Sequence, residues 1–299
     1  MKPPINPYLA LAVGVITVSA SAIFVKFSAS SAGLTAFYRL FFSVLFMLPL
    51  FLAKFTPELK KITKRDWLFT IVSGVLLAFH FILWFESLNY TSVASSTVLV
   101  TLQPLFAFLG TYLFFKEKVT IGAITSGIIA IAGSFIISWG DFRVSGSALY
   151  GDFLALVACA FITAYLLFGQ TVRQRVSLIT YTFLVYLISS ITLFLYVIGT
   201  GDSFIPKENS DWINFILLAL LPTLLGHSLF NWVVKWISTN TISMAILFEP
   251  IGAAILAYLL LGESVMWSQV IGGGVVIAGI SLFIISERRI KMREPAIQK

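Results

Sequence analysis

The chain has 299 residues with a mean hydropathy of +0.97; apolar residues make up 59% of it and charged residues only 11%. A soluble domain carries roughly 25% charged residues, so this composition excludes a soluble globular enzyme, a disordered chain and a collagen-like fibre. The net charge of +7 would favour nucleic-acid binding in a soluble protein, but here we expect the charges beside a membrane. The single cysteine, Cys159, excludes an internal disulfide framework.

Apolar runs of about 20 residues recur along the chain, which is the length that a helix needs to cross about 30 Å of hydrocarbon. The strict alternation that is typical of outer-membrane barrel strands is absent. The sequence therefore predicts an all-α membrane protein with ten transmembrane helices and no room for a soluble catalytic domain. The predicted spans are 7–27, 34–53, 67–88, 93–115, 119–138, 149–169, 178–199, 212–232, 239–261 and 266–286.

Positive charges are unevenly divided between the two sets of loops. If the N-terminus is cytoplasmic, sixteen of the 20 Lys and Arg residues lie in cytoplasmic segments and only Arg143 and Lys207 lie in outer loops. The positive-inside rule then predicts a multi-pass protein of the cell membrane with both termini in the cytoplasm. Residues 287–299 would form a basic cytoplasmic tail. Because the basic loops face the anionic inner leaflet, no nucleic-acid partner is expected.

An internal repeat relates the two halves of the chain at an offset of 146 residues. Ten of the 30 positions from Pro104 to Gly133 are identical in the second half, where the corresponding stretch runs from Pro250 to Gly279. The repeat unit holds five helices, and this odd number makes the second half enter the membrane from the opposite side. We therefore expect two inverted five-helix repeats, at 1–139 and 147–286, an architecture typical of secondary transporters.

Both halves contain motifs of a known family. The run LFEPIGAA at 247–254, followed by LLGE at 260–263, resembles the signature helix of EamA-type transporters of the drug/metabolite transporter superfamily. The first half has LQPLFA at 102–107, and SLNYTSVA at 87–94 resembles the family's linker between helices 3 and 4. The resemblance implies ten helices in two tandem repeats that export or exchange small metabolites such as amino acids. The first half departs from it by having Gln103 where the second has Glu249, so only the second half can supply a charged coupling group.

Polar groups inside spans are expensive in lipid, so each one is expected to face a partner or a cavity. Glu249 lies near the middle of its span. It could couple transport to protons or contact a cationic group of the substrate, or else it could satisfy backbone groups near Pro250, which lacks an N–H. The equivalent Gln103 beside Pro104 favours the structural interpretation, because an uncharged amide serves there.

Two histidines mark related positions in the repeat. His80 and Trp84 are four residues apart and share one helix face, which would suit an amphipathic or aromatic substrate through stacking or cation–π contact. The alternatives are a histidine that bonds to a neighbouring helix and a lipid-interface role for Trp84. His227 aligns with His80 within one position, and Asn231 shares its face. We expect these residues to border a central cavity between the halves. The candidate substrate-pathway residues are His80, Trp84, Gln103, Tyr165, His227, Asn231 and Glu249.

Arg39 and Glu86 lie near the predicted outer ends of spans 2 and 3. One interpretation is an ion pair, or snorkelling of the arginine to the outer surface. The other is an outer gate or a site for a substrate carboxylate, because arginine binds carboxylates through two parallel hydrogen bonds. Glycines crowd spans 5 and 10, among them Gly133 and Gly279, and predict close packing between helices or between protomers.

Three functional classes compete, and a secondary transporter working by alternating access is favoured. A channel would need a ring of like residues or a pore loop, and neither is present. An intramembrane hydrolase is disfavoured because the adjacent His227 and Ser228 point about 100° apart on a helix. Zinc and P-loop motifs are missing, so no catalytic residues, metal site or cofactor is expected. The expected partners are a small-molecule substrate, the lipid bilayer and, as an open alternative, protons; substrate identity, direction and oligomeric state stay undecided.

Overall fold

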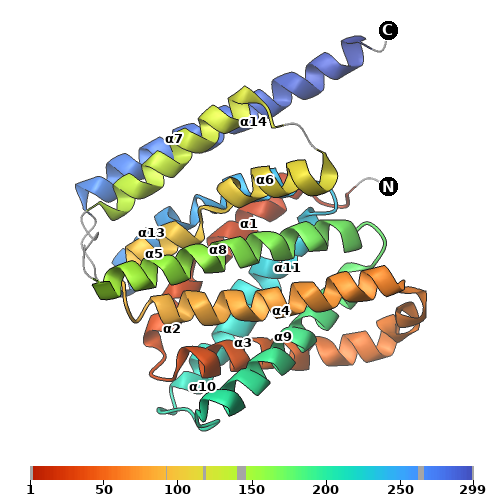
Figure 1. Ribbon diagram of the computed structural model, residues 1–299, viewed down its shortest axis with the longest axis vertical. Helices are drawn as coiled ribbons and strands as arrows, with labels where there is room; N and C mark the ends of the chain where they lie inside the picture. Colours follow the sequence, from red (N-terminus) through yellow and green to blue (C-terminus); the bar gives the residue numbers. More distant parts are fainter. Residues whose placement is uncertain (1–2, 92, 117–118, 140–145, 262–265, 298–299) are drawn as a thin grey trace.

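The computed structural model describes residues 3–91, 93–116, 119–139, 146–261 and 266–297, with side chains for all of these except 93–94, 138, 257, 261 and 287–297. Every regular element in these segments is a helix, and the helices form one bundle (Figure 1). Nine stretches are long and apolar enough to cross a membrane, and Ile121–Ile137 is a shorter apolar helix. An all-α fold with ten membrane-crossing segments is therefore confirmed for the described part of the chain.

The first half contains five crossings, and its first and fourth are interrupted. The second crossing continues beyond α3 through two short helical turns before the chain reverses. The elements are α1 (Pro7–Ser19), α2 (Ser21–Phe27), α3 (Ala32–Leu50), η1 (Phe51–Phe55), η2 (Thr56–Lys61), α4 (Lys64–Ser87), α5 (Val93–Val100), α6 (Gln103–Phe115) and α7 (Ile121–Ser138).

The second half repeats this plan, with interruptions in its third and fourth crossings. The predicted basic tail begins inside the last helix, which runs to Ile297; the side chains of 287–299 lie outside the described residues. The elements are α8 (Gly146–Val172), α9 (Leu178–Thr200), α10 (Asp211–Leu218), η3 (Ala219–His227), α11 (Ser228–Val233), α12 (Thr239–Ile246), α13 (Glu249–Leu261) and α14 (Trp267–Ile297).

Serine and threonine caps set several helix starts. Ser31, Thr63, Thr120, Ser177 and Ser238 each precede a helix and accept a hydrogen bond from a backbone N–H three residues on. The N-terminal N–H groups of a helix have no partner within it, and such a cap satisfies one of them. These caps explain why α4 begins at Lys64, three residues before its predicted start.

The fourth crossing of each half is broken at the same place. The sequence predicts continuous spans at 93–115 and 239–261, but α5 ends at Val100 before α6 begins at Gln103, and α12 ends at Ile246 before α13 begins at Glu249. Pro104 and Pro250 explain both breaks, because proline has no N–H and disfavours helical geometry in the residue before it. Both predicted spans are present, and each consists of a pair of half-helices.

The packing of the helices follows an inverted repeat. In the first half α4 lies against α8 of the second half, and the equivalent pair is η3 and α11 against α1. Two further large contacts join equivalent helices to each other, α7 to α14 and α3 to α9, and α4 also packs against α9. Because each half holds five crossings, equivalent helices run in opposite directions through the membrane, and both chain ends lie on one side of the bundle (Figure 1). The two predicted inverted five-helix repeats are confirmed.

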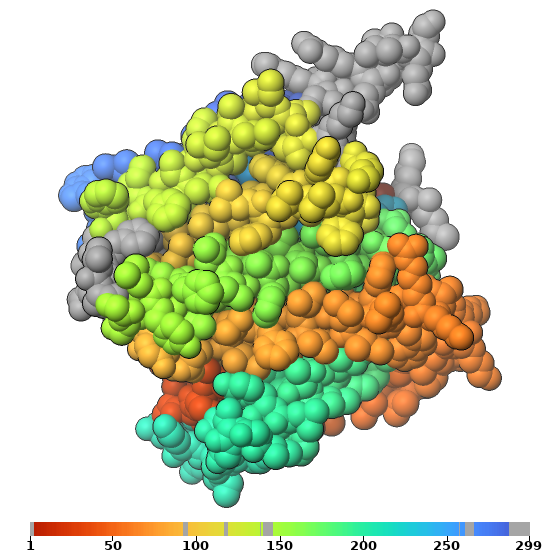
Figure 2. Space-filling view, viewed as in Figure 1, coloured from red at the N-terminus to blue at the C-terminus, as the bar shows by residue number. Residues whose placement is uncertain are grey.

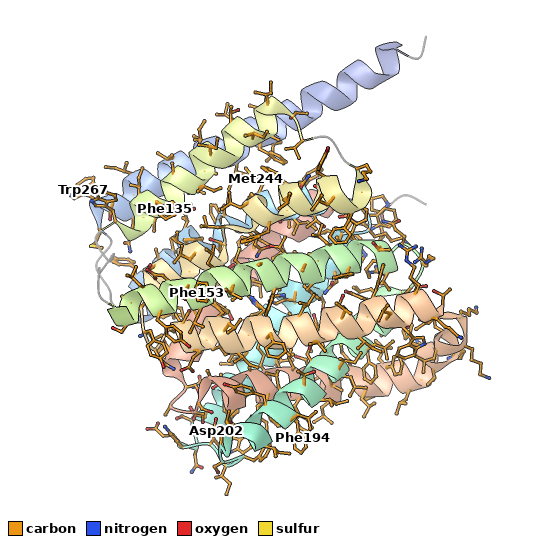
Figure 3. All side chains as sticks on the ribbon, in the orientation of Figure 1. Phe135, Phe153, Phe194, Asp202, Met244 and Trp267 are labelled. Carbon is orange, nitrogen blue, oxygen red and sulfur yellow. The ribbon has the colours of Figure 1, made fainter. Side chains whose placement is uncertain are left out.

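Large apolar side chains cover the outside of the bundle. Phe153, Phe194 and Trp267 are 61%, 42% and 81% exposed, and Figure 3 shows Phe194 and Trp267 at the edge of the bundle. On the face drawn in Figure 2, side chains of α4, α8 and α9 close over the interior. An exterior this apolar would aggregate in water, whereas in a bilayer it faces lipid tails.

The contact between α7 and α14 depends on glycine. A Cβ atom on Gly133 would lie 2.6 Å from the backbone nitrogen of Val276, and one on Gly279 would lie 2.6 Å from that of Ala130. Backbone cannot yield as a flexible side chain can, so these positions admit hydrogen only. The predicted close packing is therefore seen between two helices of one chain, where small residues allow close approach.

This contact predicts that alanine substitutions at two glycines of α14 change the thermal midpoint differently. Gly279→Ala should lower the thermal midpoint of the detergent-purified protein, because overpacking destabilises by about 1–3 kcal/mol. Gly274→Ala is the matched control: nothing lies within 4 Å of its added Cβ, and alanine favours a helix. Equal midpoints for the two variants would contradict this account of the contact.

Candidate functional site

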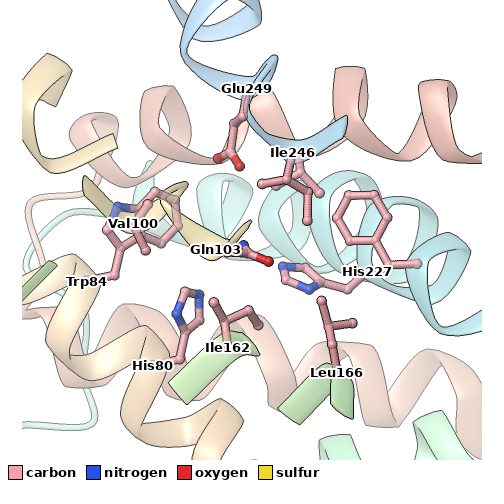
Figure 4. Close-up of a pocket in the computed structure, with 11 residues that line it drawn as sticks. His80, Trp84, Val100, Gln103, Ile162, Leu166, His227, Ile246 and Glu249 are labelled. Atoms are coloured by element: carbon pink, nitrogen blue, oxygen red, sulfur yellow. The ribbon is translucent and has the colours of Figure 1, made fainter. Parts of the chain in front are cut away.

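A small cavity lies in the middle of the bundle, between the two halves (Figure 4). Its volume is about 20 Å³, enough for roughly one water molecule. Five of the seven candidate pathway residues line it, and each is at most 6% exposed. The five are His80, Trp84, Gln103, His227 and Glu249.

The two helix breaks and their repeat-related neighbours bring these side chains together. Gln103 and Glu249 are the first residues of the half-helices α6 and α13, and they occupy equivalent positions in the repeat. His80 comes from the middle of α4, and His227 ends η3. Two inverted half-helices therefore present one amide and one carboxyl group to the same space.

The hydrogen bond of His80 determines which of its two ring nitrogens carries the proton and which one is an acceptor. Its Nδ1 lies 3.0 Å from the carbonyl oxygen of Ala158 on α8. A carbonyl can only accept, so Nδ1 must carry the proton, and Nε2 of the neutral ring is then an acceptor. The ring also stacks on Trp84, with centroids 5.9 Å apart and planes 20° apart.

Several buried polar atoms at the cavity have no partner among the described residues. These are Trp84 Nε1, Gln103 Oε1 and His227 Nδ1. Buried polar groups are nearly always hydrogen-bonded in folded proteins, and an unpaired one is destabilising by about 1–3 kcal/mol. Three such atoms around one cavity indicate a place where a bound molecule would supply the missing hydrogen bonds.

The prolines free two backbone acceptors at residues that line the cavity. In a continuous helix the N–H of residue 104 would bond to the carbonyl of Val100, and that of residue 250 to the carbonyl of Ile246. Pro104 and Pro250 cannot donate these bonds, and Val100 and Ile246 both line the cavity. With the Glu249 carboxyl group and Gln103 Oε1, the residues around the cavity thus offer several acceptors. Its remaining walls are apolar and come from Val18, Ile162, Leu166 and Phe230.

Tyr165 and Asn231 lie outside the cavity lining. Both are fully buried, and the Asn231 amide donates to the Tyr165 hydroxyl. The same amide donates to the carbonyl oxygen of His227 over 2.9 Å. The pair therefore lies one helical turn beyond His227, where it joins α8 to α11 next to the cavity.

Arg39 is buried deep in the bundle instead of snorkelling to a surface. Its exposure is 0%, Nε donates to Thr223 Oγ1 over 2.7 Å, and a terminal nitrogen donates to Ser21 Oγ over 2.8 Å. Its guanidinium carbon lies 4.1 Å from the centre of the Phe81 ring. The snorkelling interpretation is wrong, because the short polar partners on α2 and η3 hold the charge inside.

Within the described residues, Arg39 and Glu86 do not form the ion pair considered above. Glu86 is half-buried near the end of α4 and accepts a hydrogen bond from Asn89 over 3.2 Å. Arg39 lies near enough to Glu249 for their charges to interact, although no hydrogen bond joins them. The charged neighbour of Arg39 is thus the cavity carboxyl group rather than Glu86.

Sequence reasoning missed the groups that support the site. Ser21 and Thr223 hold Arg39, and Ala158 orients His80 through its backbone, but small hydroxyl and alanine residues are too common in spans to single out. The freed carbonyls of Val100 and Ile246 did carry a signal, because a proline four residues after a helical position always removes that bond.

The buried arginine predicts a coupling that can be measured. Thr223→Val should lower the thermal midpoint, because it leaves Arg39 Nε without an acceptor, a loss of about 1.5–3 kcal/mol for a bond to a charged group. In an Arg39→Met background the same change should have a much smaller effect. Thr163→Val is the control, since Thr163 is equally buried but bonds only within its own helix. Equal effects of Thr223→Val in the two backgrounds would contradict a stabilising hydrogen bond between Arg39 and Thr223.

Comparisons with known proteins agree with this architecture. A sequence model of the EamA-like transporter family matches residues 6–139 and 149–285. The uncharacterized transporter YxxF of Bacillus subtilis is 26% identical over 251 residues, which are 83% of this chain and 80% of that one. The riboflavin transporter ImpX of Fusobacterium nucleatum is 24% identical over 237 residues, 74% of this chain and 79% of that one.

A solved crystal structure, described only as that of a protein, has the same fold. It superposes with a TM-score of 0.77 at 15% sequence identity, and the match covers 95% of this chain and 98% of that chain. At that identity the likeness concerns the fold alone.

Proposed function

Because the chain belongs to the EamA-like transporter family, we propose that it moves a small metabolite through the central cavity as a secondary transporter. Its mode is export or exchange by alternating access. The observation that carries this proposal is the meeting of five buried polar side chains at two inverted helix breaks. Discontinuous helices at the interface of inverted repeats are the usual place for a transporter's substrate site.

The chain is a transporter rather than an enzyme, as the family and the transporter names of its relatives indicate. The hydrolase alternative also finds no support around Ser228. That hydroxyl lies 3.4 Å from the carbonyl oxygen of Thr223 and 3.3 Å from the Tyr186 hydroxyl. A serine nucleophile needs a base within hydrogen-bond reach, and neither of these groups is one.

The cavity chemistry favours a substrate that donates hydrogen bonds. Glu249, Gln103 Oε1 and two freed carbonyls are acceptors, so a protonated amine or another N–H group would fit there, and the amino group of an amino acid is one example. The stacked His80 and Trp84 would suit a flat ring. One relative is named for riboflavin, and a ring of that kind is a second candidate for this chain.

Arg39 supports a further part of this proposal. One terminal nitrogen of its guanidinium has no partner in the described part of the chain, and its charge lies within range of the Glu249 carboxyl group. A substrate carboxylate could bond to that nitrogen while its amino group contacts Glu249. We retain this role for Arg39, and an outer-gate role for Arg39 and Glu86, as proposals.

The size of the cavity supports alternating access. Sites for small molecules usually enclose about 300–1,000 Å³, whereas this cavity has about 20 Å³. The bundle must therefore open on one side to admit a metabolite. Two inverted repeats can exchange their shapes, so the same sequence can open to either side.

The proposed orientation places both termini in the cytoplasm. Single cysteines at Lys61 and Lys207, in a Cys159→Ala background, should react with an impermeant thiol reagent from opposite sides, because one lies at the end of η2 and the other in the loop before α10. On intact cells we expect labelling at position 207 only. Labelling at 61 alone would reverse the orientation, and labelling at both would contradict the membrane topology.

A substitution at Glu249 distinguishes proton coupling from binding of a cationic group of the substrate. We expect Glu249→Gln to abolish uptake driven by a pH gradient in proteoliposomes loaded from a pooled metabolite library, and to leave substrate exchange intact, because an amide keeps the shape but cannot carry a proton. Loss of both activities would instead assign Glu249 to a cationic group of the substrate. Wild-type rates in both assays would limit it to a structural role. Glu208→Gln is the matched control, since Glu208 lies in the loop before α10, outside the cavity.

A further inference from the structure

Carboxylate side chains join the two halves at both ends of the bundle, outside the cavity. At one end, Asp66 in the first turn of α4 binds Arg175 in the loop between α8 and α9, and the contact is an ion pair. Eight residues earlier, Glu58 accepts from Ser177 N over 2.7 Å and also from the Ser177 and Thr180 hydroxyls. We name Glu58, Asp66, Arg175, Ser177 and Thr180 the Asp66 latch.

The opposite end carries a second set of contacts. Asp211, in the first turn of α10, accepts from Ala29 N over 2.9 Å and from Ser30 Oγ over 2.6 Å. Nine residues earlier, Asp202 accepts from Ser31 Oγ over 2.8 Å, and it lies at the edge of the bundle (Figure 3). We name Asp202, Asp211 and residues 29–31 the Asp211 latch.

The two latches are equivalent under the inverted repeat. Asp66 corresponds to Asp211 at an offset of 145 residues, and Ser177 to Ser31 at an offset of 146. Both serines are N-caps, of α9 and of α3. In each latch, carboxylates of one half hold the loop before the second long helix of the other half. The same interaction is therefore built twice, once at each membrane surface.

All the contacts of both latches are formed while the cavity between them is closed. Each latch crosses from one half to the other, so the halves cannot separate at a surface while its latch is intact. From this geometry we propose that the two latches are the paired gates of the transporter, and that the release of one, while the other holds, opens the cavity to that side. This inference rests on the proposed alternating access.

The latches differ in the chemistry of one position. Arg175, whose side chain is half-exposed, occupies the place that Ala29 occupies in the other half. The Asp66 latch thus contains an ion pair at the water surface, which salt screens, whereas the Asp211 latch uses neutral hydroxyl and backbone donors. Raised salt should weaken the first latch more than the second.

Accessibility of the cavity from each side tests the gates without knowledge of the substrate. The reporter is Val18→Cys in a Cys159→Ala background, because Val18 lines the cavity; the probe is an impermeant methanethiosulfonate applied to intact cells or to inverted vesicles. Glu58→Gln with Asp66→Asn should raise the labelling rate about tenfold from the surface that bears Asp66. Asp202→Asn with Asp211→Asn should raise it from the other surface.

Controls separate gating from general loosening. Gln174→Ala alters a contact inside the second half, to the carbonyl of Lys235, and Glu208→Gln alters one inside its own loop, so neither should change labelling. Asp66→Arg with Arg175→Asp reverses the ion pair and should restore slow labelling relative to either single change. Such rescue cannot come from a misfolded protein.

Two outcomes would overturn different proposals. If both sets of latch variants match the controls, or raise labelling from the same side, the latches are not gates. If the reporter is labelled from one side only in every variant and at every salt concentration, the alternating access on which the latches rest is itself contradicted.

Discussion

Inside a bilayer no water is available for a backbone group that a helix leaves unpaired, and this constraint governs the rest of the structure. A lipid-facing helix break would be severely destabilising, so breaks occur only where protein or a wet cavity meets them. Pro104 and Pro250 break the fourth crossing of each half, and both breaks are turned toward the middle of the bundle. The helix breaks, which lipid would not tolerate, thus lie beside the central cavity.

Charged groups obey the same constraint. Arg39 is held inside by Ser21, Thr223 and the face of Phe81, so its charge is distributed over hydroxyl partners and an aromatic ring. Glu249 stands at the start of α13, where the helix dipole favours a carboxylate. The other buried carboxylates of the described segments, Asp66 and Asp211, lie at the two ends of the bundle, where a loop of the opposite half supplies donors.

Duplication supplies the symmetry, and substitutions then make the halves different. Gln103 and Glu249 stand at equivalent breaks, but only one of them can carry a proton. Arg175 and Ala29 stand at equivalent loops, but only one of them forms an ion pair. Under the proposed alternating access, two halves of nearly the same shape exchange conformations, and the unequal chemistry at these positions makes the two open states chemically different.

The sequence by itself determined the helical membrane fold, the ten crossings, the inverted repeat and the family, because apolar run length, repeat offset and signature motifs are properties of the chain alone. It also indicated five of the residues that line the cavity, since a polar side chain in a span must face away from lipid. Only the tertiary structure decided that Arg39 is buried near Glu249 rather than paired with Glu86, and that Tyr165 and Asn231 bond to each other beside the cavity. Those outcomes depend on which side chains of distant helices meet, and a contact between helices of opposite halves leaves no periodic trace in the sequence.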